Sequence, residues 1–446
     1  MSQSIFDILE RGPATSKQLQ SLTGLSQTAV SLQIRKAGDR IIHKQDGRTR
    51  LYMLTCFAFN SGDSLPLYMV DAHGNSTAVA YILPLAHGGF YVKPNTGMPA
   101  VLLGESGDGF FDDLPYFLDD LKPQGFMGRQ IATELAHHTG EFPADPRDWS
   151  TELIGQYLTS NGDDLPGNFK VGHQAHLRLR FPPLVYTEDD YPTLADEVLK
   201  GVKSGSSAGG EQPKFTAFNS NRSAHVIVKF SPKGDDLVAK RWRDILITEF
   251  HAVEALHDKG FPAVEARLIE RGDRLFFEST RFDRVAEHGR LSLISLSAVD
   301  AEFTGIGANW PKVINALHER KLISIEHAYD AIFMWHFGRL INNTDMHLGN
   351  LSLAIDGDVF RLLPVYDMCS MGFAPKASEV LPYGFTPPDK VVTPLVADIG
   401  EVKRTAYDFW ERVSNDPRIS IELRDFLEFG NPINLGGDDS IREIFD

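Results

Sequence analysis

The alternation of apolar and polar residues predicts secondary structure along the chain, and its signals are clearest at the beginning. Residues 3–11 show the three- and four-residue spacing of apolar side chains that is typical of a short helix. Two more helices are predicted at 15–24 and 26–38, because each segment begins with hydroxyl side chains and ends on a glycine. A strand, an Asp-Gly turn and a second strand follow within residues 40–54. The pattern therefore predicts three helices and a hairpin.

These predicted elements resemble the winged helix-turn-helix of bacterial regulators. In the segment 26–38, Val30, Ile34 and Ala37 fall on one helix face and leave polar residues on the outward face. The outward residues are Gln27, Thr28, Ser31 and Arg35, and the hairpin adds Lys44, Arg48 and Arg50. The helix side chains would meet base edges of duplex DNA and the hairpin cations would meet phosphates. A module of this kind can also serve protein contacts or dimerisation, and the sequence leaves both functions open.

Charge sets the same residues apart from the rest of the chain. The 446 residues carry a net charge of −16. Residues 1–54 contain eight Lys and Arg against four Asp and Glu, a net +4, which leaves −20 on the remainder. A small basic module on an acidic body is expected where one end of a protein meets a polyanion.

Composition is that of a globular protein with several domains, since 42% of the residues are hydrophobic and 23% are charged. No apolar run approaches the roughly 20 residues that cross a bilayer, and the first residues lack the pattern of a secretory signal. We therefore expect a cytoplasmic protein with no membrane partner. Only two cysteines occur, Cys56 and Cys369, which argues against a disulfide framework or a cysteine-rich zinc site.

Four features in the second half of the chain are informative because of their order. A Gly/Ser-rich loop at 201–215 leads into strands, and Lys229 then lies in an apolar strand. Glu249 follows in an amphipathic helix, and a strand at 274–285 ends in a connector. Each feature alone has an ordinary structural explanation. Their order, however, is that in which the small lobe of a protein kinase covers, grips and orients the phosphates of ATP.

A further set of polar residues follows an apolar segment. In TDMHLGN, at 344–350, Asp345 is followed five residues later by Asn350, which is the spacing of a kinase catalytic loop, although NNTD replaces the usual His-Arg-Asp. Asp367 comes seventeen residues after Asn350 and after a strand-like run, where a kinase places its metal-binding aspartate. Phosphoryl transfer needs a carboxylate for the acceptor hydroxyl and oxygen ligands for Mg2+. The spacing therefore predicts a phosphotransferase centre.

Taken together, these motifs resemble the HipA-type serine/threonine kinases of bacterial toxin-antitoxin systems. The similar segments, in the family's order, are SSAGGEQPKF, HVIVKF, TEFHAVEAL, TRFDR, TDMHLGN and PVYDM, and the likeness covers about residues 60–435. The resemblance implies an α+β, protein-kinase-like bilobal fold with an N-terminal winged helix-turn-helix. The implied domains are a winged helix-turn-helix at 1–54, a HipA-like N-terminal subdomain at 55–149, a small lobe with the phosphate loop at 150–284 and a helical large lobe at 285–446.

The resemblance also implies an activity and a role for each motif residue. The chain would be an ATP- and Mg2+-dependent protein serine/threonine kinase that arrests growth. Asp345 would be the catalytic base, and Asn350 and Asp367 would hold Mg2+. Lys229, oriented by Glu249, would contact the ATP phosphates. Further ATP contacts would come from Gly209 and Gly210 in the loop and from Thr280, Arg281 and Phe282 in the connector.

Regulation and partners are likewise implied by the resemblance. In the family, a serine of the loop that matches SGSSAGG is phosphorylated in trans, which switches the kinase off. Ser206 is the best match, with Ser204 and Ser207 as alternatives. His347 also matches the family's loop, and we expect it to brace that loop. The implied partners are an aminoacyl-tRNA synthetase as substrate, an antitoxin and duplex DNA, and a homodimer is expected because winged helices usually read two-fold sites.

Two other functions account for part of the sequence. A transcription regulator could use a kinase-like body as a nucleotide or ligand sensor, but a sensor needs no catalytic base and the chain retains Asp345. The acidic residues could instead form the carboxylate pair of a glycosidase, which explains neither Lys229 nor the Gly/Ser-rich loop.

Overall fold

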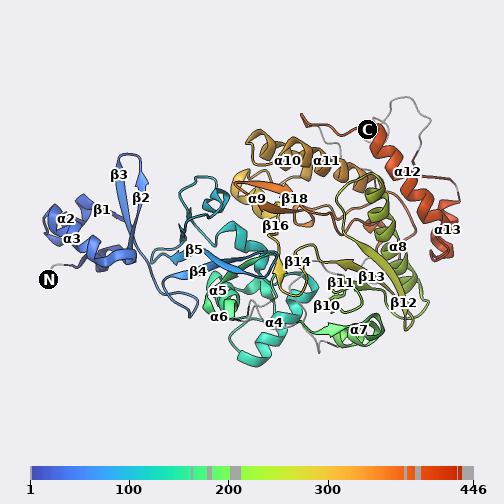
Figure 1. The fold of residues 1–446 in the computed structure, drawn as a ribbon, viewed down its shortest axis with the longest axis horizontal. Helices are drawn as coiled ribbons and strands as arrows, with labels where there is room; N and C mark the ends of the chain where they lie inside the picture. Colours follow the sequence, from blue (N-terminus) through green and yellow to red (C-terminus); the bar gives the residue numbers. More distant parts are fainter. Residues whose placement is uncertain are drawn as a thin grey trace.

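The computed structural model consists of a small N-terminal unit attached to a large body of helices and sheets (Figure 1). It describes residues 3–161, 164–177, 183–200, 212–375, 379–386, 393–428 and 430–433. Within these ranges, no helix combines the length and the apolar character that a membrane span requires.

The N-terminal unit contains the three helices and the hairpin that the sequence predicts. Its elements are α1 (Ile5–Leu9), β1 (Ala14–Thr15), α2 (Ser16–Thr23), α3 (Gln27–Ala37), β2 (Ile41–Asp46) and β3 (Thr49–Leu54), and the strands pair antiparallel in the order β1-β3-β2. The side chains of Ser4, Thr15 and Ser26 accept hydrogen bonds from first-turn amides and so begin the three helices. Gly24, with a φ of 73°, ends α2.

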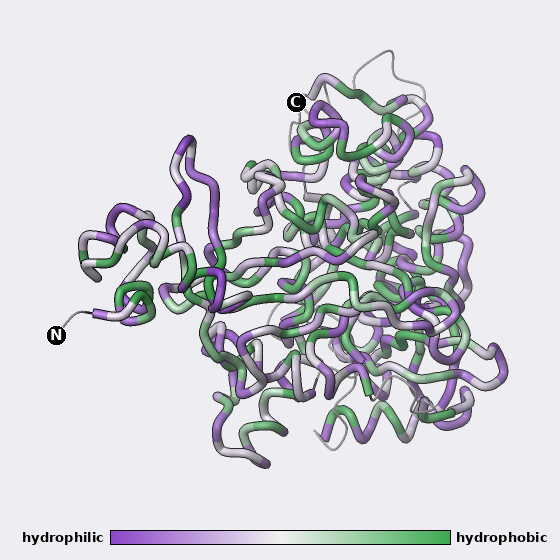
Figure 2. The backbone as a smooth tube through the Cα atoms, turned by 60° about the vertical axis from the view of Figure 1, so that its left-hand side comes forward, coloured by the Kyte–Doolittle hydropathy of each residue, from purple (hydrophilic) through white to green (hydrophobic). Residues whose placement is uncertain are grey.

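The hairpin attaches this unit to the body. Ile42 and Met53 pack with Leu83 and Leu85, which lie on a strand of the body and just after it. Two ion pairs flank this contact: Lys44 Nζ lies 2.9 Å from Asp108 Oδ2, and Lys93 Nζ lies 2.7 Å from Asp39 Oδ2. The tip of the hairpin extends beyond this contact and is coloured as hydrophilic in Figure 2. The unit therefore rests on the body through the base of its hairpin.

The first sheet of the body has the strand order β7-β6-β5-β4-β8. Its strands are β4 (Leu65–Val70), β5 (Ser76–Pro84), β6 (Phe90–Pro94), β7 (Phe110–Phe111) and β8 (Phe169–Val171). The segments between and after these strands form the 3-10 segment η3 (Tyr116–Leu121) and the helices α4 (Gly125–Thr139), α5 (Thr151–Ser160) and α6 (His173–Leu177). Because β8 pairs with β4, this sheet is completed by a strand that comes after residue 149, where the sequence placed a domain boundary.

The second sheet has the order β12-β13-β11-β10-β9 and carries Lys229. Its strands are β9 (Val185–Tyr186), β10 (Lys214–Asn219), β11 (Ala224–Phe230), β12 (Ala266–Arg271) and β13 (Arg274–Thr280). Val226, Val228 and Phe230 point into a cluster that includes residues of α7 (Tyr191–Leu199). Because side chains alternate along a strand, Lys229 faces the other side of the sheet, where it meets α8 (Leu237–Asp258).

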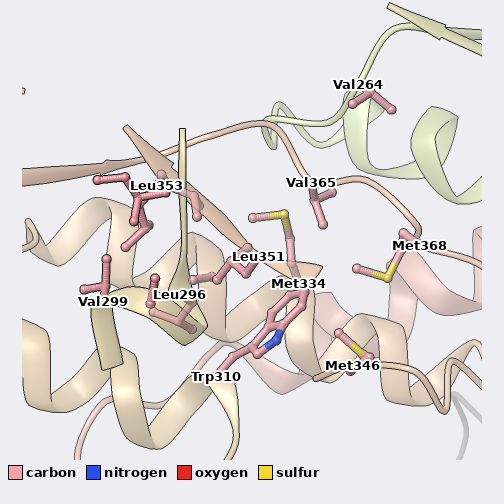
Figure 3. Packing of buried hydrophobic residues seen from close by; sticks show 14 of the residues in the cluster. Val264, Leu296, Val299, Trp310, Met334, Met346, Leu351, Leu353, Val365 and Met368 are labelled. Carbon is pink, nitrogen blue, oxygen red and sulfur yellow. The ribbon is translucent and has the colours of Figure 1, made fainter. Parts of the chain in front are cut away.

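The remainder of the body is mainly helical. Its helices are α9 (Leu296–Phe303), α10 (Trp310–Glu319), α11 (Ile325–Leu340), α12 (Ile399–Asn415) and α13 (Ile421–Leu427); its strands are β14 (Arg284–Val285), β15 (Gly289–Arg290), β16 (Ile294–Ser295), β17 (Ser352–Asp356) and β18 (Val359–Leu362). Most residues of α11 are buried, as in a helix that crosses a core. Figure 3 shows Met334 of this helix packed among residues that include Met346 and Met368. This core lies beneath the segment that holds Asp345 and Asn350.

Candidate active site

A cavity of about 340 Å³ lies between the second sheet and the helical part of the body. Seven of the residues predicted for the site line it: Lys229, Glu249, Thr280, Arg281, Phe282, Asn350 and Asp367. They come from β11, α8, the segment around the end of β13, the loop after α11 and the segment after β18. The volume falls in the usual range for small-molecule sites, roughly 300–1,000 Å³. The fold therefore brings distant motifs to one cavity.

Lys229 lies at the centre of a buried ion-pair cluster. Its Nζ lies 2.5 Å from Glu249 Oε1 and 2.6 Å from Asp367 Oδ1, and its side chain is 6% exposed. Burial alone would lower the pKa of Lys229, but the carboxylates of Asp367 and Glu249 outweigh burial and raise the pKa above its ordinary value. Burial would raise the pKa of Asp367, yet the nearby lysines, Lys229 above all, lower it to about 2. Both groups are therefore charged at neutral pH.

Asp367 also has an unusual backbone conformation. Its φ is 53°, in the left-handed region that residues other than glycine seldom adopt, although aspartate tolerates it better than most. Asn343 Nδ2 donates to the carbonyl oxygen of Asp367 at 3.2 Å, and the next two residues, Met368 and Cys369, are buried. Backbone strain of this kind is concentrated at functional sites.

The loop that carries Asp345 is held by its own polar side chains. The amide of Asp345 donates to Asn343 Oδ1 at 3.0 Å, and Asn350 Nδ2 donates to the carbonyl oxygen of Asp345 at 2.6 Å. Beneath the loop, Gly338 of α11 allows close packing, since a Cβ there would lie 2.3 Å from Met346 Sδ. The loop therefore lies directly on the core helix and presents the side chain of Asp345, which is half exposed.

His347 connects several parts of this loop. Its Nδ1 accepts a hydrogen bond from the amide of Gly349 at 3.1 Å, and its carbonyl oxygen accepts one from Trp310 Nε1 at 2.9 Å. Its Nε2 lies 3.7 Å from Asp345 Oδ1. Burial and the charge of Asp367 raise the pKa of Asp345, and the neighbouring His347 opposes this rise. These contacts are those of a bracing residue.

The connector after β13 contributes apolar surface and one unusual hydroxyl. The rings of Phe282 and Tyr366 stack with centroids 5.7 Å apart, and both residues line the cavity. The buried hydroxyl of Thr280 has no hydrogen-bond partner among the described residues. Arg281 differs, because its guanidinium pairs with Asp283 Oδ2 at 3.0 Å in a buried cluster. Thr280, Phe282 and Tyr366 therefore contribute to the surface that a planar ligand in the cavity would contact.

The sequence prediction missed several residues that line the cavity, among them Lys214, Tyr366 and Asp120. Lys214 on β10 is directly opposite Lys229 on β11 and is buried. A lysine within an apolar strand, the signal that identified Lys229, also marks Lys214. Tyr366 precedes Asp367, and Asp120 reaches the cavity from η3, where its Oδ2 accepts a hydrogen bond from the amide of Ser295 at 2.6 Å. The position of Asp120 depends on packing between distant segments, for which the sequence carries no local signal.

The other predicted residues lie either outside the described part of the chain or in the N-terminal unit, away from the cavity. Ser206, Gly209 and Gly210 lie outside the described residues. Of the residues predicted to contact DNA, six are exposed in the N-terminal unit: Gln27, Thr28, Ser31, Arg35, Arg48 and Arg50. Lys44 differs from them because its ammonium is paired with Asp108 and lies 5.0 Å from the centre of the Phe110 ring.

The donor set at the cavity is suited to Mg2+ bound together with phosphates. Among the described residues, no group of three or more His, Cys, Asp and Glu side chains is arranged to hold a metal ion. Asn350 and Asp367 supply one amide oxygen and one carboxylate to the cavity. Mg2+ in kinases takes its remaining ligands from nucleotide phosphates and water, so two protein side chains fit this use.

Comparisons with known proteins agree with this arrangement. Residues 61–180 match the family model of the YjjJ-like toxin middle domain, and residues 206–425 match that of the HipA-like C-terminal domain. Toxin YjjJ of Escherichia coli (strain K12) is 33% identical over 435 residues, which cover 94% of each chain. The chain belongs to the YjjJ-like family of HipA-type toxins. This assignment confirms the family that the sequence motifs indicate.

A solved structure of the family supports the fold. A chain from the complex of Shewanella oneidensis MR-1 HipA, HipB and operator DNA matches 85% of this chain with 93% of its own, at a TM-score of 0.54 and 14% identity. The α+β, kinase-like bilobal fold expected from the sequence is therefore confirmed. The Helicobacter pylori kinase CtkA gives a TM-score of 0.35 over 56% of this chain, at 15% identity, which is too low to carry an argument.

Proposed function

We propose that this member of the YjjJ-like family is an ATP- and Mg2+-dependent protein serine/threonine kinase that arrests growth. One observation carries the proposal. One cavity is lined by four residues from separate segments, namely Lys229, Glu249, Asn350 and Asp367. Asp345 lies next to this cavity, since its carbonyl oxygen accepts a hydrogen bond from the side chain of Asn350. This is the set of groups that phosphoryl transfer uses.

In this proposal, Asp345 accepts the proton of the substrate hydroxyl, and the hydroxyl oxygen attacks the γ-phosphorus of ATP. The bond between that phosphorus and the bridging oxygen of the β-phosphate breaks, and ADP leaves. The carboxylate is half exposed, so a protein segment can reach it, and Asn343, Asn350 and His347 fix its position. A positioned general base typically contributes 10²- to 10⁴-fold to a rate. Mg2+, when bound, supplies positive charge that offsets the charge of the transferring phosphoryl group.

Lys229 binds phosphate oxygens in this proposal, and Glu249 keeps its ammonium in place. The buried ion pair between them supports this role, because Glu249 comes from α8 and fixes Lys229 against the sheet. Phe282, which stacks on Tyr366, would present a ring face to the adenine, with the hydroxyl of Thr280 nearby. Gly209 and Gly210 would cover the phosphates, and Ser206 in the same loop is the proposed site of autophosphorylation.

The N-terminal unit is proposed to be a winged helix-turn-helix that binds duplex DNA. Its net charge of +4 and the exposure of Arg35, Arg48 and Arg50 support this role. An antitoxin and an aminoacyl-tRNA synthetase are proposed as protein partners by analogy with the family alone.

Label transfer from γ-labelled ATP tests the proposal. Purified protein is incubated with Mg2+ and ATP, alone and with cell extract, beside the variants Asp345→Ala and Asp356→Ala. Asp356 is an exposed aspartate at the end of β17 and serves as the matched control. We expect label on the protein or on an extract protein with wild type and Asp356→Ala only. Equal labelling by Asp345→Ala would refute the assignment of the base.

Mass spectrometry of the labelled protein locates the modified serine. Replacing Ser206 by alanine should remove the phosphopeptide, whereas the same change at Ser204 or Ser207 should leave it. Loss of the phosphopeptide only in the Ser204 or Ser207 variant would move the site to that residue.

A further inference from the structure

A second hollow, of about 610 Å³, shares no lining residue with the candidate active site. Four of its lining residues are arginines: Arg243 near the start of α8, Arg271 and Arg274 in the β12–β13 hairpin and Arg418 before α13. These elements lie together at one side of the molecule (Figure 1). Glu270 and Asp273 also line the hollow. The hollow therefore gathers four guanidinium groups, whose N–H donors suit an anion, beside carboxylates that would compete with it.

Two of the arginines are held in place by partners within the protein. Arg274 is 4% exposed, donates to the carbonyl oxygen of Ser231 at 2.7 Å and pairs with Asp196 at 3.0 Å. Its buried Nε has no hydrogen-bond partner among the described residues. Arg418 pairs with the buried carboxylate of Asp416 at 2.6 Å. These two guanidinium groups are therefore positioned before any ligand arrives, which lowers the entropic cost of binding.

The other two arginines have exchangeable partners. Arg243 Nη1 lies 2.6 Å from Asp235 Oδ1, and Arg271 Nε lies 3.5 Å from Asp189 Oδ1. Both carboxylates are more than four-fifths exposed, and ion pairs that are so exposed to solvent contribute little. A dianion in the hollow would offer each guanidinium a more highly charged partner than a single solvated carboxylate. Arg243 Nη2 and Arg271 Nη1 also donate to the carbonyl oxygens of Asp273 and Glu270, both at 3.1 Å. The ion-paired nitrogens of the two arginines are therefore the ones available to a ligand at small cost.

We propose that this arginine hollow binds a phosphate monoester dianion. The planar guanidinium fork matches the oxygens of a phosphate group and binds it in a bidentate manner. The hollow is larger than one phosphate group, so it also has room for the group that carries the phosphate. A phosphorylated side chain and a small phosphate ester share this chemistry, and the experiment below separates them.

The position of the hollow links it to the active site. Ile247 lines the hollow and lies two residues before Glu249 on α8. Leu275 lines it from β13, the strand whose Phe277 pairs with Lys229 of β11. A phosphate bound to both α8 and β13 would therefore stabilise the relative position of these two elements. The same two elements support the ion pair of Lys229 and Glu249.

Isothermal titration of the full chain, without ATP, tests the proposal. The two probes are glycerol phosphate, a small phosphate ester, and a short phosphoserine peptide, each beside its unphosphorylated control, glycerol and the unphosphorylated peptide. We expect saturable binding of at least one probe, and the probe that binds more tightly identifies the source of the phosphate. The combined variant Arg243→Gln and Arg271→Gln should weaken binding by roughly tenfold for each guanidinium removed. Arg147→Gln, at a highly exposed arginine outside the hollow, should leave binding unchanged.

Removal of the competing carboxylates provides a test that a purely structural cluster would not pass. Asp189→Asn and Asp235→Asn leave the arginines in place and should tighten binding of the same probe. The proposal is overturned if neither probe binds saturably to the wild-type protein. It is equally overturned if the combined arginine variant, shown to be folded by circular dichroism, binds as tightly as wild type.

Discussion

In the cleft between the lobes the charged residues are buried against one another, whereas in the N-terminal unit most of them stand in solvent. Lys229, Glu249 and Asp367 form one cluster in which each group determines the charge state and position of the others. Arg35 and Arg48 are exposed on separate elements of the N-terminal unit. Buried charges act through fixed geometry, so the loss of one disables the set. Exposed charges act through their sum and are screened by salt.

The strongest test of this contrast removes the central lysine. Lys229→Met should abolish phosphoryl transfer and lower the free energy of unfolding by about 3–5 kcal/mol, because the buried carboxylate of Glu249 and the mostly buried carboxylate of Asp367 lose their partner. Adding Glu249→Gln removes one of these charges and should restore part of the stability but none of the activity. Urea unfolding and label transfer on the same preparations measure both quantities. A stable and active Lys229→Met variant would show that the cluster is not required.

A pH titration sharpens the contrast between buried and exposed groups. Burial lowers the pKa of His336, on α11, from 6.5 to about 4. The unfolded chain therefore takes up a proton at a higher pH than the folded chain, so the free energy of unfolding falls as pH drops from about 6.5 towards 4. His336→Phe should remove about 2 kcal/mol of the fall between pH 7 and pH 5. An unchanged fall in this variant would mean that His336 is not the group responsible.

Removing positive charge from the N-terminal unit should weaken its binding to DNA in proportion to the charge removed, rather than abolish it. Replacing Arg35 and Arg48 together by alanine should weaken binding to duplex DNA and reduce its salt dependence by about one phosphate contact, that of Arg48. Transfer activity should remain as in wild type. Arg147→Ala in the body is the control. If the unaltered protein binds no duplex DNA at low salt, the exposed face of α3 is better explained as a protein contact.

Removing the ion pair between Lys44 and Asp108, at the hairpin of the N-terminal unit, should have the smallest effect on the free energy of unfolding. Lys44 and Asp108 are partly exposed, so their pairing should contribute less than about 1 kcal/mol to stability. A double-mutant cycle with Lys44→Ala and Asp108→Ala measures this coupling. A coupling of several kcal/mol would show that this partly exposed pair behaves like the buried cluster of the cavity, contrary to the contrast drawn here.

The N-terminal unit can be predicted from sequence because its signals are local. Ser4, Thr15 and Ser26 begin their helices within the same few residues that contain the helical pattern. Lys229, Glu249, Asp345 and Asp367 can be found in the same way, since each lies in a short motif. By contrast, the pairing of β8 with β4 joins segments about a hundred residues apart. Asp120 reaches the cavity only through such packing, so no local pattern identifies it.

One measurement tests the central claim most directly, because it separates binding of the nucleotide from transfer of its phosphate. Affinity for ATP with Mg2+ and the rate of phosphoryl transfer are measured on wild type and on Asp345→Asn. We expect both proteins to bind ATP with similar affinity, and the transfer rate of the variant to fall by at least about 100-fold. Equal transfer rates would contradict a catalytic role for Asp345, and wild-type protein that binds ATP without transferring phosphate would instead indicate a sensor.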